Sequence, residues 1–392
     1  MRFIHTSDWH IGKTLKGRDR LNEQAAVLTE IIAHATTHDV DAVLVAGDLY
    51  DTAAPTADAQ RLVVSTLMQL RATGAEVIAI AGNHDHAPTF EAYRPLMDAA
   101  GITLVGQPRP STHGGVVSFT ARSTGENVRV AVLPFVSQRY AVSAAELVAN
   151  SPAENSASYD EQVRGMVTAL SEDFSAESVN IVMAHLTVIG GAFGGGERTA
   201  QSIFEYSVPA SIFGNTPHYV ALGHLHRRQQ LAAPCPVHYS GSPYAIDFGE
   251  QDNISAICLV EASPGVPAKV TDIEITSAAK LRTVRGTVAE LGARAQELLD
   301  GFLRVWVQEP ARAGLRDEVA AILPNALEVR IDPDFLADKS HAHTPRTDGR
   351  RSAAELFDDL MATQNVDDKR VTELFRRLHD ETVSARSSGA ST

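Results

Sequence analysis

The chain has 392 residues, of which 44% are hydrophobic and 21% charged, and its formal net charge is −14. This length predicts two or three domains with a core large enough to need no disulfide or metal staples. The two cysteines, Cys235 and Cys258, form no CxxC pattern, so the composition speaks against a disulfide framework and against a zinc cage. The negative charge speaks against a protein that grips DNA over its whole surface, because affinity for phosphates comes from clustered Lys and Arg.

The N-terminal segment MRFIHTSDWHIG lacks the basic stretch and the apolar run of a signal peptide. No apolar stretch approaches the roughly 20 residues that a membrane helix requires. We therefore expect a cytoplasmic protein without a membrane partner.

The first half of the chain alternates apolar strands with helical stretches, which is typical of a layered α/β domain. Helical spacing is seen over 21–38 and from Pro55, a favoured first-turn residue, to Gly74, a typical helix stop. The predicted strands cover 2–6, 41–46, 76–81, 116–119, 128–133, 179–184 and 219–222.

Two segments have the composition of loops. Residues 150–158 are small and polar, and residues 190–198 (GGAFGGGER) are rich in glycine. The second lacks GxxxxGK[ST], so it is not expected to be a nucleotide P-loop. A mobile loop beside a functional site is the better interpretation.

The composition changes after residue 262, which predicts a first domain over 1–262. Residues 281–332 alternate strand and helix patterns, which predicts a small α/β domain over 281–335. A polar linker is expected over 336–351. Two amphipathic helices are expected over 352–382, with apolar stripes suited to docking.

Five short polar blocks follow predicted strands. The side chains of open α/β sheets that bind ligands lie beyond the carboxyl ends of strands. Mixed Asp, His and Asn side chains without a thiolate suit Mn²⁺, Fe²⁺, Zn²⁺ or Mg²⁺. The blocks are Asp8-Trp9-His10, Gly47-Asp48-Leu49-Tyr50-Asp51, Gly82-Asn83-His84-Asp85, His185 and Gly223-His224-Leu225-His226.

The spacing within these blocks indicates which side chains can bind the same cation. Asp8 and His10 are two residues apart, so on an extended segment they face the same side and can grip one cation. His224 and His226 share this spacing, although a loop can also divide them between two cations. Asp48 follows an apolar strand and a glycine, where a carboxylate has little reason to lie unless it binds something positive. Two cations sharing one carboxylate are the arrangement that drives in-line phosphoryl displacement.

Each block taken singly favours an ordinary structural role. An Asp after a strand usually caps a turn, and a lone His such as His185 is more often a satisfied core residue. The combination, in this order and at strand ends, favours the metal site. The remaining histidines follow no such pattern and are expected to be structural.

At these residues the sequence resembles the calcineurin-like metallophosphoesterase superfamily, whose signatures are D-x-H, GD-x-x-D, GNH-[DE], a lone His and GH-x-H. Within it, the chain is most similar to the SbcD family of bacterial nuclease subunits. Four longer stretches carry this closer resemblance. They are HTSDWHIGKTLKGRDRLNEQ, AHLTVIGG, YVALGHLHRRQ and HYSGSPYAIDFGE.

The resemblance implies a fold and specific residue roles. The fold would be a layered αββα sandwich with a small α/β capping domain and a C-terminal helical pair. Asp8, His10 and His226 would hold one metal ion. Asn83, His185 and His224 would hold the other, and Asp48 would bridge the two. The catalytic residues would be His84, which would face the scissile phosphate, and Asp85, which would orient His84.

The resemblance also implies partners and an activity. The cofactors would be two divalent ions, with Mn²⁺ the usual choice. The activity would be 3′-to-5′ exonuclease action on duplex DNA and endonuclease action on single strands and hairpins, in repair and recombination. The chain would form a homodimer. The helical pair would dock on an SbcC-type coiled-coil ATPase, unless its stripes pack on their own domain. The capping domain would face DNA with Arg282, Arg285, Arg294, Arg304 and Arg312.

Two other functions compete with this interpretation. The first is another enzyme of the superfamily, because cyclic-nucleotide phosphodiesterases share GNHD and GH-x-H; protein phosphatases typically have GD-x-x-DRG and GNHE, whereas this chain has GDLYDTA and GNHD. The second is a scaffold without activity that binds a partner through the C-terminal helices. The complete set of expected ligands speaks against the scaffold.

Overall fold

The structure is a computed structural model that describes residues 1–137, 152–197, 207–335 and a few positions between 356 and 378. The chain divides into two compact units, Met1–Pro333 and Asp334–Thr392. The expected linker over 336–351 lies outside the described residues, as does most of 352–382. In the second unit the rings of Phe357 and Phe375 are stacked, with centroids 3.8 Å apart. The C-terminal helical pair therefore stays a prediction.

The first sheet of the larger unit has six strands in the order β14-β13-β1-β2-β3-β4. Neighbours among β1 to β4 are parallel, and β13 and β14 are antiparallel additions at one edge. The bounds are β1 Arg2–Thr6, β2 Ala42–Val45, β3 Glu76–Ile80, β4 Ile102–Val105, β13 Ala256–Ser263 and β14 Val266–Glu274. This sheet therefore runs past residue 262, where we expected the first domain to end, because β14 pairs with β13 along its length.

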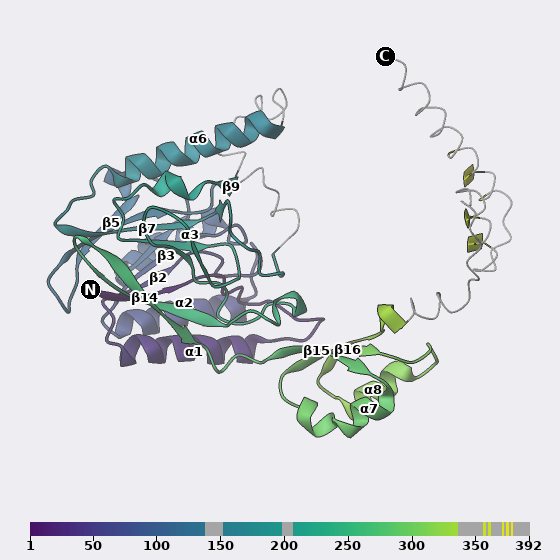
Figure 1. Cartoon of the computed structure of the whole chain (residues 1–392). Helices are drawn as coiled ribbons and strands as arrows, with labels where there is room; N and C mark the ends of the chain where they lie inside the picture. The colour runs from purple at the N-terminus through teal and green to yellow at the C-terminus, as the bar shows by residue number, and fades with distance from the viewer. Residues whose placement is uncertain are drawn as a thin grey trace, which may run out of the picture. The chain divides into compact units, whose positions relative to one another are not determined.

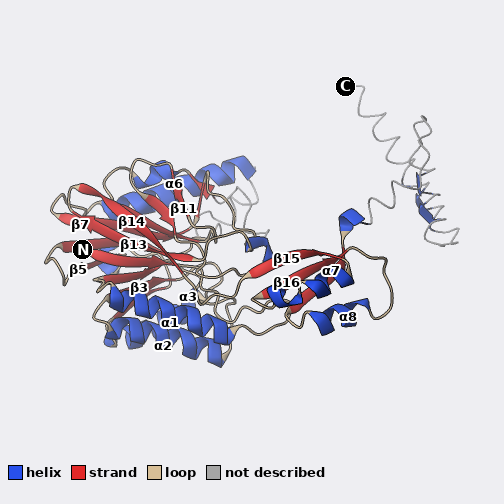
Figure 2. Ribbon diagram, turned by 60° about the horizontal axis from the view of Figure 1, so that its bottom comes forward, coloured by secondary structure: helices blue, strands red, loops and turns tan. Residues whose placement is uncertain are grey.

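Three helices cover the outer face of this sheet: α1 (Leu21–Thr37), α2 (Ala57–Ala72) and α3 (Ala87–Ala99). Figure 2 shows α1 and α2 side by side against it. Thr56 caps α2 by accepting a hydrogen bond from Ala59 N, so Pro55 precedes the cap and does not lie in the first turn as expected. Gly74, at φ 93°, follows the helix in the left-handed conformation that favours glycine.

The second sheet also has six strands, in the order β11-β12-β10-β7-β6-β5. Its bounds are β5 Val116–Thr120, β6 Asn127–Leu133, β7 Ser178–His185, β10 Tyr219–Gly223, β11 Gln229–Leu231 and β12 Val237–Tyr239. A separate two-stranded sheet pairs β8 (Thr187–Val188) with β9 (Ser207–Val208). Short 3₁₀ turns cover Ser111–His113, Ala210–Phe213, Phe248–Glu250 and Ala295–Leu298.

Helix α6 (Pro152–Ser171) covers the outer face of the second sheet. The loop expected over 150–158 is thus wrong for its described part, because 152–158 form the first turns of this helix. Tyr159, Val163 and Val167 recur at helical spacing and are buried against the sheet. Their burial supplies the stability that the polar first turns lack.

The inner faces of the two sheets pack on each other. Along β1, Phe3 points into this central core and Ile4 into the core beneath the helices. Apolar strands are expected where both faces of a sheet are covered. The expected αββα layering is confirmed by these three cores, and Figure 1 shows the sheets between α1 and α2 on one side and α6 on the other.

Within the larger unit, the small α/β domain has its own core around a parallel sheet in the order β15-β16-β17. Its elements are β15 Leu281–Gly286, α7 Val288–Ala293, β16 Phe302–Val307, α8 Leu315–Ile322 and β17 Ala326–Ile331. Thr287 and Glu290 form a reciprocal capping box that starts α7. The strand and helix order expected for 281–332 is confirmed. No helix among the described residues has the length and hydropathy to cross a membrane.

Candidate metal centre

The expected ligands follow the carboxyl ends of five strands, three in the first sheet and two in the second. Asp8 and His10 follow β1, Asp48 follows β2 and Asn83 follows β3. His185 ends β7, and the GHLH segment follows from β10. Since the two sheets pack face to face, these strand ends meet, and the structure brings the ligand candidates together.

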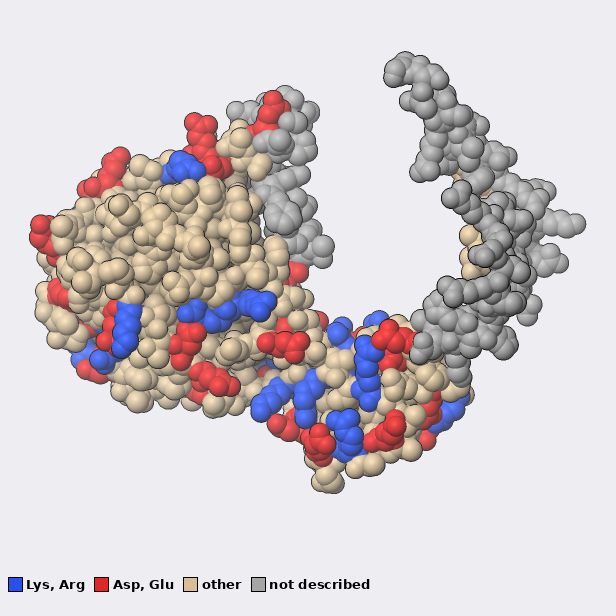
Figure 3. Space-filling view, in the orientation of Figure 1, with Lys and Arg blue, Asp and Glu red and all other residues tan. Residues whose placement is uncertain are grey.

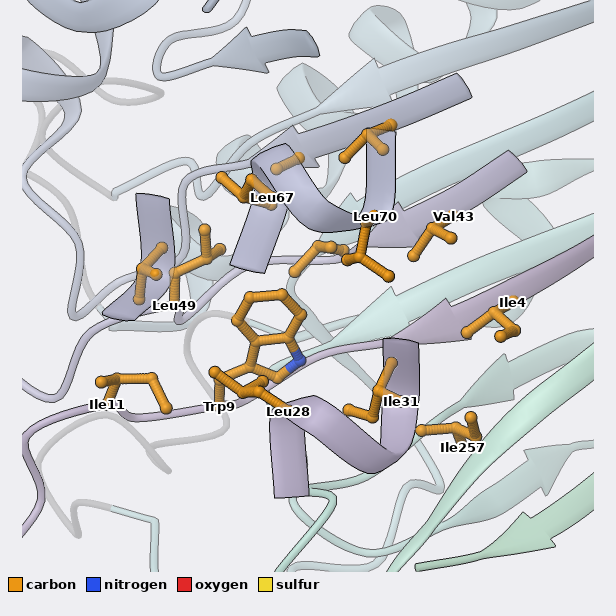
Figure 4. Packing of buried hydrophobic residues seen from close by; sticks show 14 of the residues in the cluster. Ile4, Trp9, Ile11, Leu28, Ile31, Val43, Leu49, Leu67, Leu70 and Ile257 are labelled. Carbon is orange, nitrogen blue, oxygen red and sulfur yellow. The ribbon is translucent and has the colours of Figure 1, made fainter. Parts of the chain in front are cut away.

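Trp9 anchors the DWH segment. Its side chain is fully buried among Leu28, Leu49 and Leu67 (Figure 4), and its Nε1 donates a hydrogen bond to Thr6 Oγ1. The residues on either side, Asp8 and His10, have φ angles of 53° and 42°, in the left-handed region that non-glycine residues rarely adopt. Because the Trp9 side chain packs into the core, the side chains of Asp8 and His10 are available to the proposed metal site. Such strain is typical of functional loops held by their surroundings.

The first cluster joins Asp8, His10 and His226, whose ligating atoms lie within 4.8 Å of one another. Nε2 of His10 is 3.1 Å from Nε2 of His226. The other ring nitrogen of His226, Nδ1, lies 2.6 Å from Glu250 Oε1. Because a carboxylate only accepts, Nδ1 of His226 carries a hydrogen, which leaves Nε2, the nitrogen that faces His10, as the atom available to a cation.

The second cluster joins Asn83, His185 and His224. The Asn83 Oδ1 atom is 2.9 Å from His185 Nε2 and 2.8 Å from His224 Nδ1. His185 donates from Nδ1 to the carbonyl oxygen of Ala46 at 2.8 Å, which leaves Nε2 as the nitrogen that faces Asn83.

Asp48 lies between the clusters. Its Oδ2 is 3.6 Å from His10 Nε2 and 3.5 Å from His185 Nε2, and its Oδ1 accepts a hydrogen bond from His84 N. A Cβ atom at Gly82 would overlap the Asp48 carboxylate, which explains why glycine stands there. The Asp48 carboxylate thus lies close to one histidine of each cluster.

These residues fit a pair of cations. The facing nitrogens of His10 and His226, and Asn83 Oδ1 with the nitrogens of His185 and His224, are buried at hydrogen-bond distance, so a shared cation or proton satisfies them. Burial lowers the pKa of His226, but the hydrogen bond and charge of Glu250 outweigh it and raise that pKa to about 9. Burial also lowers the pKa of His185, but the charge and hydrogen bond of Asp48 outweigh it and raise that pKa to about 9. Where a cation is absent, each of these two imidazoles therefore carries a second proton.

His84 lies beside this centre, with its ring centroid 4.6 Å from that of His10. Its Nδ1 donates to the carbonyl oxygen of Asp51 at 2.7 Å. We expected Asp85 to orient His84, but the Asp85 carboxylate accepts hydrogen bonds from the backbone N–H groups of Leu49, Tyr50 and Gly82. Asp85 therefore ties the loop after β2 to the loop after β3, and the backbone of Asp51 orients His84.

Two acidic residues of the site are not predicted from the sequence. Glu250 contacts His226 Nδ1, and Glu197 accepts a hydrogen bond from His226 N. With His226 they form a further group of close ligating atoms. Glu250 ends the stretch HYSGSPYAIDFGE, and the need of a ligating histidine for a carboxylate on its second nitrogen is the signal that could have identified it. Cys235 and Cys258 are both buried free thiols.

Comparison with known proteins agrees with this geometry. The family described as calcineurin-like phosphoesterase matches residues 1–228. The chain is 34% identical over 281 residues to the SbcD subunit of the nuclease SbcCD from Bacillus subtilis, covering 71% of this chain and 70% of that protein. The SbcD subunit of the same nuclease from Escherichia coli K12 is 27% identical over 76% of this chain and 74% of its own length.

A third relative, the SbcD subunit from Rhodobacter capsulatus, is 32% identical over 68% of this chain and 67% of its own length. The matched family model covers the strand ends that carry every expected ligand. The chain therefore belongs to the SbcD family of nuclease subunits, within the calcineurin-like metallophosphoesterases.

Proposed function

We propose that this chain is a Mn²⁺-dependent DNA nuclease with 3′-to-5′ exonuclease activity on duplex ends and endonuclease activity on single strands and hairpins. Its role would be in DNA repair and recombination. The observation that carries the proposal is the position of Asp48, whose Oδ2 lies within 3.6 Å of a histidine from each cluster. Two divalent cations held there would supply charge for the scissile phosphate and activate water for in-line attack.

The proposed ligand assignment follows the two clusters. Asp8, His10 and His226 hold one cation, and Asn83, His185 and His224 hold the other. Asp48 bridges them. The carboxylate–imidazole–carboxamide donor set suits Mn²⁺.

His84 is the proposed catalytic residue that touches the substrate. With Nδ1 donating to the Asp51 carbonyl, its proton transfer takes place at Nε2, which would protonate or stabilise the leaving oxygen. Asp85 acts one step further away, as a positioning residue that fixes the loops on which Asp48 and His84 lie.

The partners we propose are DNA, a second copy of this chain and an SbcC-type coiled-coil ATPase, the last from the name of the relatives. On the small domain Lys and Arg side chains are interspersed with Asp and Glu (Figure 3). Arg285 pairs with Asp332, Arg304 with Glu328 and Arg312 with Glu318. Because these arginines already form ion pairs with acidic side chains, we propose that the ATPase supplies many of the contacts to DNA phosphates.

The test is degradation of end-labelled linear and hairpin DNA by the purified chain with Mn²⁺, with chelator and with the variants Asp48→Ala and His84→Ala. Hydrolysis of bis-p-nitrophenyl phosphate is measured alongside. We expect metal-dependent cutting of DNA that both variants lose. Two bound metals with cleavage of the small ester but not of DNA, even with the ATPase added, would favour a small-molecule phosphodiesterase. A chain that takes up no metal would overturn the enzyme assignment.

A further inference from the structure

The 3₁₀ turn η5 (Phe248–Glu250) lies between the metal centre and the small α/β domain. We infer that Glu250 is a positioning residue for His226, and that docking of the small domain on η5 sets the position of Glu250. This role of Glu250 rests on the proposed metal site, and it gives the small domain a route by which to control metal binding.

Glu250 is held on the metal side of η5 by both of its oxygens. Oε1 lies 2.6 Å from Nδ1 of His226, and Oε2 accepts a hydrogen bond from Ile246 N at 2.7 Å. Its side chain is 1% exposed and that of His226 is 4% exposed, so water does not replace this contact. Because the carboxylate fixes the hydrogen on Nδ1, it also fixes the lone pair of Nε2, the atom 3.1 Å from His10 Nε2.

The other side of η5 faces the small domain. Phe248 is buried in a cluster with Leu15 and Leu281, the first residue of β15. The guanidinium of Arg304 lies over the Phe248 ring, 4.7 Å from its centroid. Asp247, which caps η5, forms an ion pair with Arg304 at 3.8 Å. Phe248 and Glu250, two positions apart in one turn, thus contact the small domain and the proposed ligand His226.

The glycine-rich segment closes the space around Glu250. Glu197 accepts hydrogen bonds from the N–H groups of Gly194 and Gly195 and from His226 N. A Cβ atom at Gly196 would overlap Glu250 Oε1. Gly195 and Gly196 therefore pack their bare backbone on η5, and this accounts for these two glycines without a phosphate ligand. With no room for Glu250 to adjust, a shift of η5 would displace the carboxylate from His226.

The experiment titrates the metal-free full-length chain with Mn²⁺ by calorimetry and follows the spin coupling of the Mn²⁺ pair by electron paramagnetic resonance. For Glu250→Ala we expect binding of one of two cations to weaken roughly 10- to 100-fold and the coupled signal to be replaced by that of isolated Mn²⁺. Glu250→Gln keeps an acceptor oxygen for Nδ1, so it should restore part of the affinity. If Glu250→Ala binds two cations as the unchanged chain does, Glu250 is not a positioning residue.

The link to the small domain is tested with a matched pair of core truncations. Leu281→Ala removes a contact of Phe248, whereas Val319→Ala removes a side chain from the core of the small domain alone. We expect Leu281→Ala to weaken the same cation and Val319→Ala to leave both affinities unchanged, with thermal melting confirming that each variant is folded. Equal Mn²⁺ affinities in the two variants would overturn the link between the small domain and metal binding. So would a variant in which the small domain alone is unfolded while Mn²⁺ binding is unchanged.

These outcomes are separable from failure of the proposed nuclease. The titration involves no DNA, so a chain that binds two Mn²⁺ ions but cuts nothing refutes the proposed activity and still tests Glu250. A chain that binds no Mn²⁺ refutes both.

Discussion

His84 is oriented by the backbone of Asp51, whose carbonyl oxygen accepts a hydrogen bond from its Nδ1 at 2.7 Å. Asp51 closes the GDLYD block, and the same block supplies Asp48. One loop therefore positions both the bridging carboxylate and the ring that would meet the leaving oxygen.

Replacing His84 should separate metal binding from catalysis. We expect His84→Ala to lower the rate of DNA cleavage by roughly 10²- to 10⁴-fold while both Mn²⁺ ions stay bound, because His84 acts on the substrate and not on the cations. Metal content by mass spectrometry and single-turnover cleavage measure the two properties. Loss of one Mn²⁺ ion from this variant would instead make His84 a ligand.

Replacing Asp85 should weaken the fold around the site. Asp85→Ala leaves the buried N–H groups of Leu49, Tyr50 and Gly82 without their acceptor. Each buried group left unsatisfied costs about 1–3 kcal/mol. We expect a lower urea midpoint of unfolding together with reduced cleavage. If Asp85→Ala unfolds at the same urea concentration as the unchanged chain and only its pH profile moves, Asp85 acts on His84 as the family resemblance implies.

The metal-free chain should lose stability in mild alkali. The pKa values of His185 and His226 are raised from 6.5 to about 9. The folded state binds these protons more tightly than the unfolded state, so their stabilisation is complete below pH 6.5 and is lost as pH rises through about 9. Melting temperatures measured over this window with chelator should fall. With saturating Mn²⁺ the fall attributable to these groups should disappear, and a flat profile with chelator would contradict the assigned pKa shifts.

A methyl group at Gly196 should disturb the cation near His226. Gly196→Ala would push against Glu250 Oε1, so we expect Mn²⁺ affinity at one site to drop by roughly 10-fold. Gly165→Ala is the matched control, since the added Cβ atom meets nothing within 4 Å. Calorimetric titration compares the two. Unchanged binding in Gly196→Ala would show that the loop yields and that Glu250 tolerates its movement.

The isolated chain should bind duplex DNA weakly. Its net charge is −14, and Arg282, Arg285 and Arg304 of the small domain are engaged by acids or backbone carbonyls. We expect a Kd of about 10⁻⁶ M or weaker at physiological salt, measured by fluorescence anisotropy of a labelled duplex. Tight binding that persists at high salt would place the main DNA grip on this subunit.

The sequence predicts the site better than it predicts the edges of the fold. Strands such as β2 and β3 are evident because their apolar residues run without interruption, whereas the largely buried β4 and β13 are not predicted. The ligand candidates are evident because polar side chains follow those strands directly. Strand β14 escapes prediction because its residues are exposed or only partly buried, so it lacks the uninterrupted apolar run of a buried strand.

Other features depend on contacts between distant segments. The first turns of α6 resemble a loop in sequence because their own residues are small and polar, while the apolar residues that hold the helix begin at Tyr159. The pairing of Glu250 with His226 joins residues 24 positions apart, and no local pattern reports it. The hydrogen bonds of Asp85 cannot be foreseen either, since the neighbouring histidine is the nearer partner in sequence.

The burial of Trp9 between two proposed ligands makes it a natural optical reporter. The chain has only two tryptophans, and the other, Trp306, lies on β16 of the small domain. Trp306→Phe would leave a single indole, surrounded by Leu28, Leu49 and Leu67, whose emission follows the larger domain alone. Trp9→Phe would leave the indole that follows the small domain. The two emissions together would reveal whether the two domains melt in one step or in sequence.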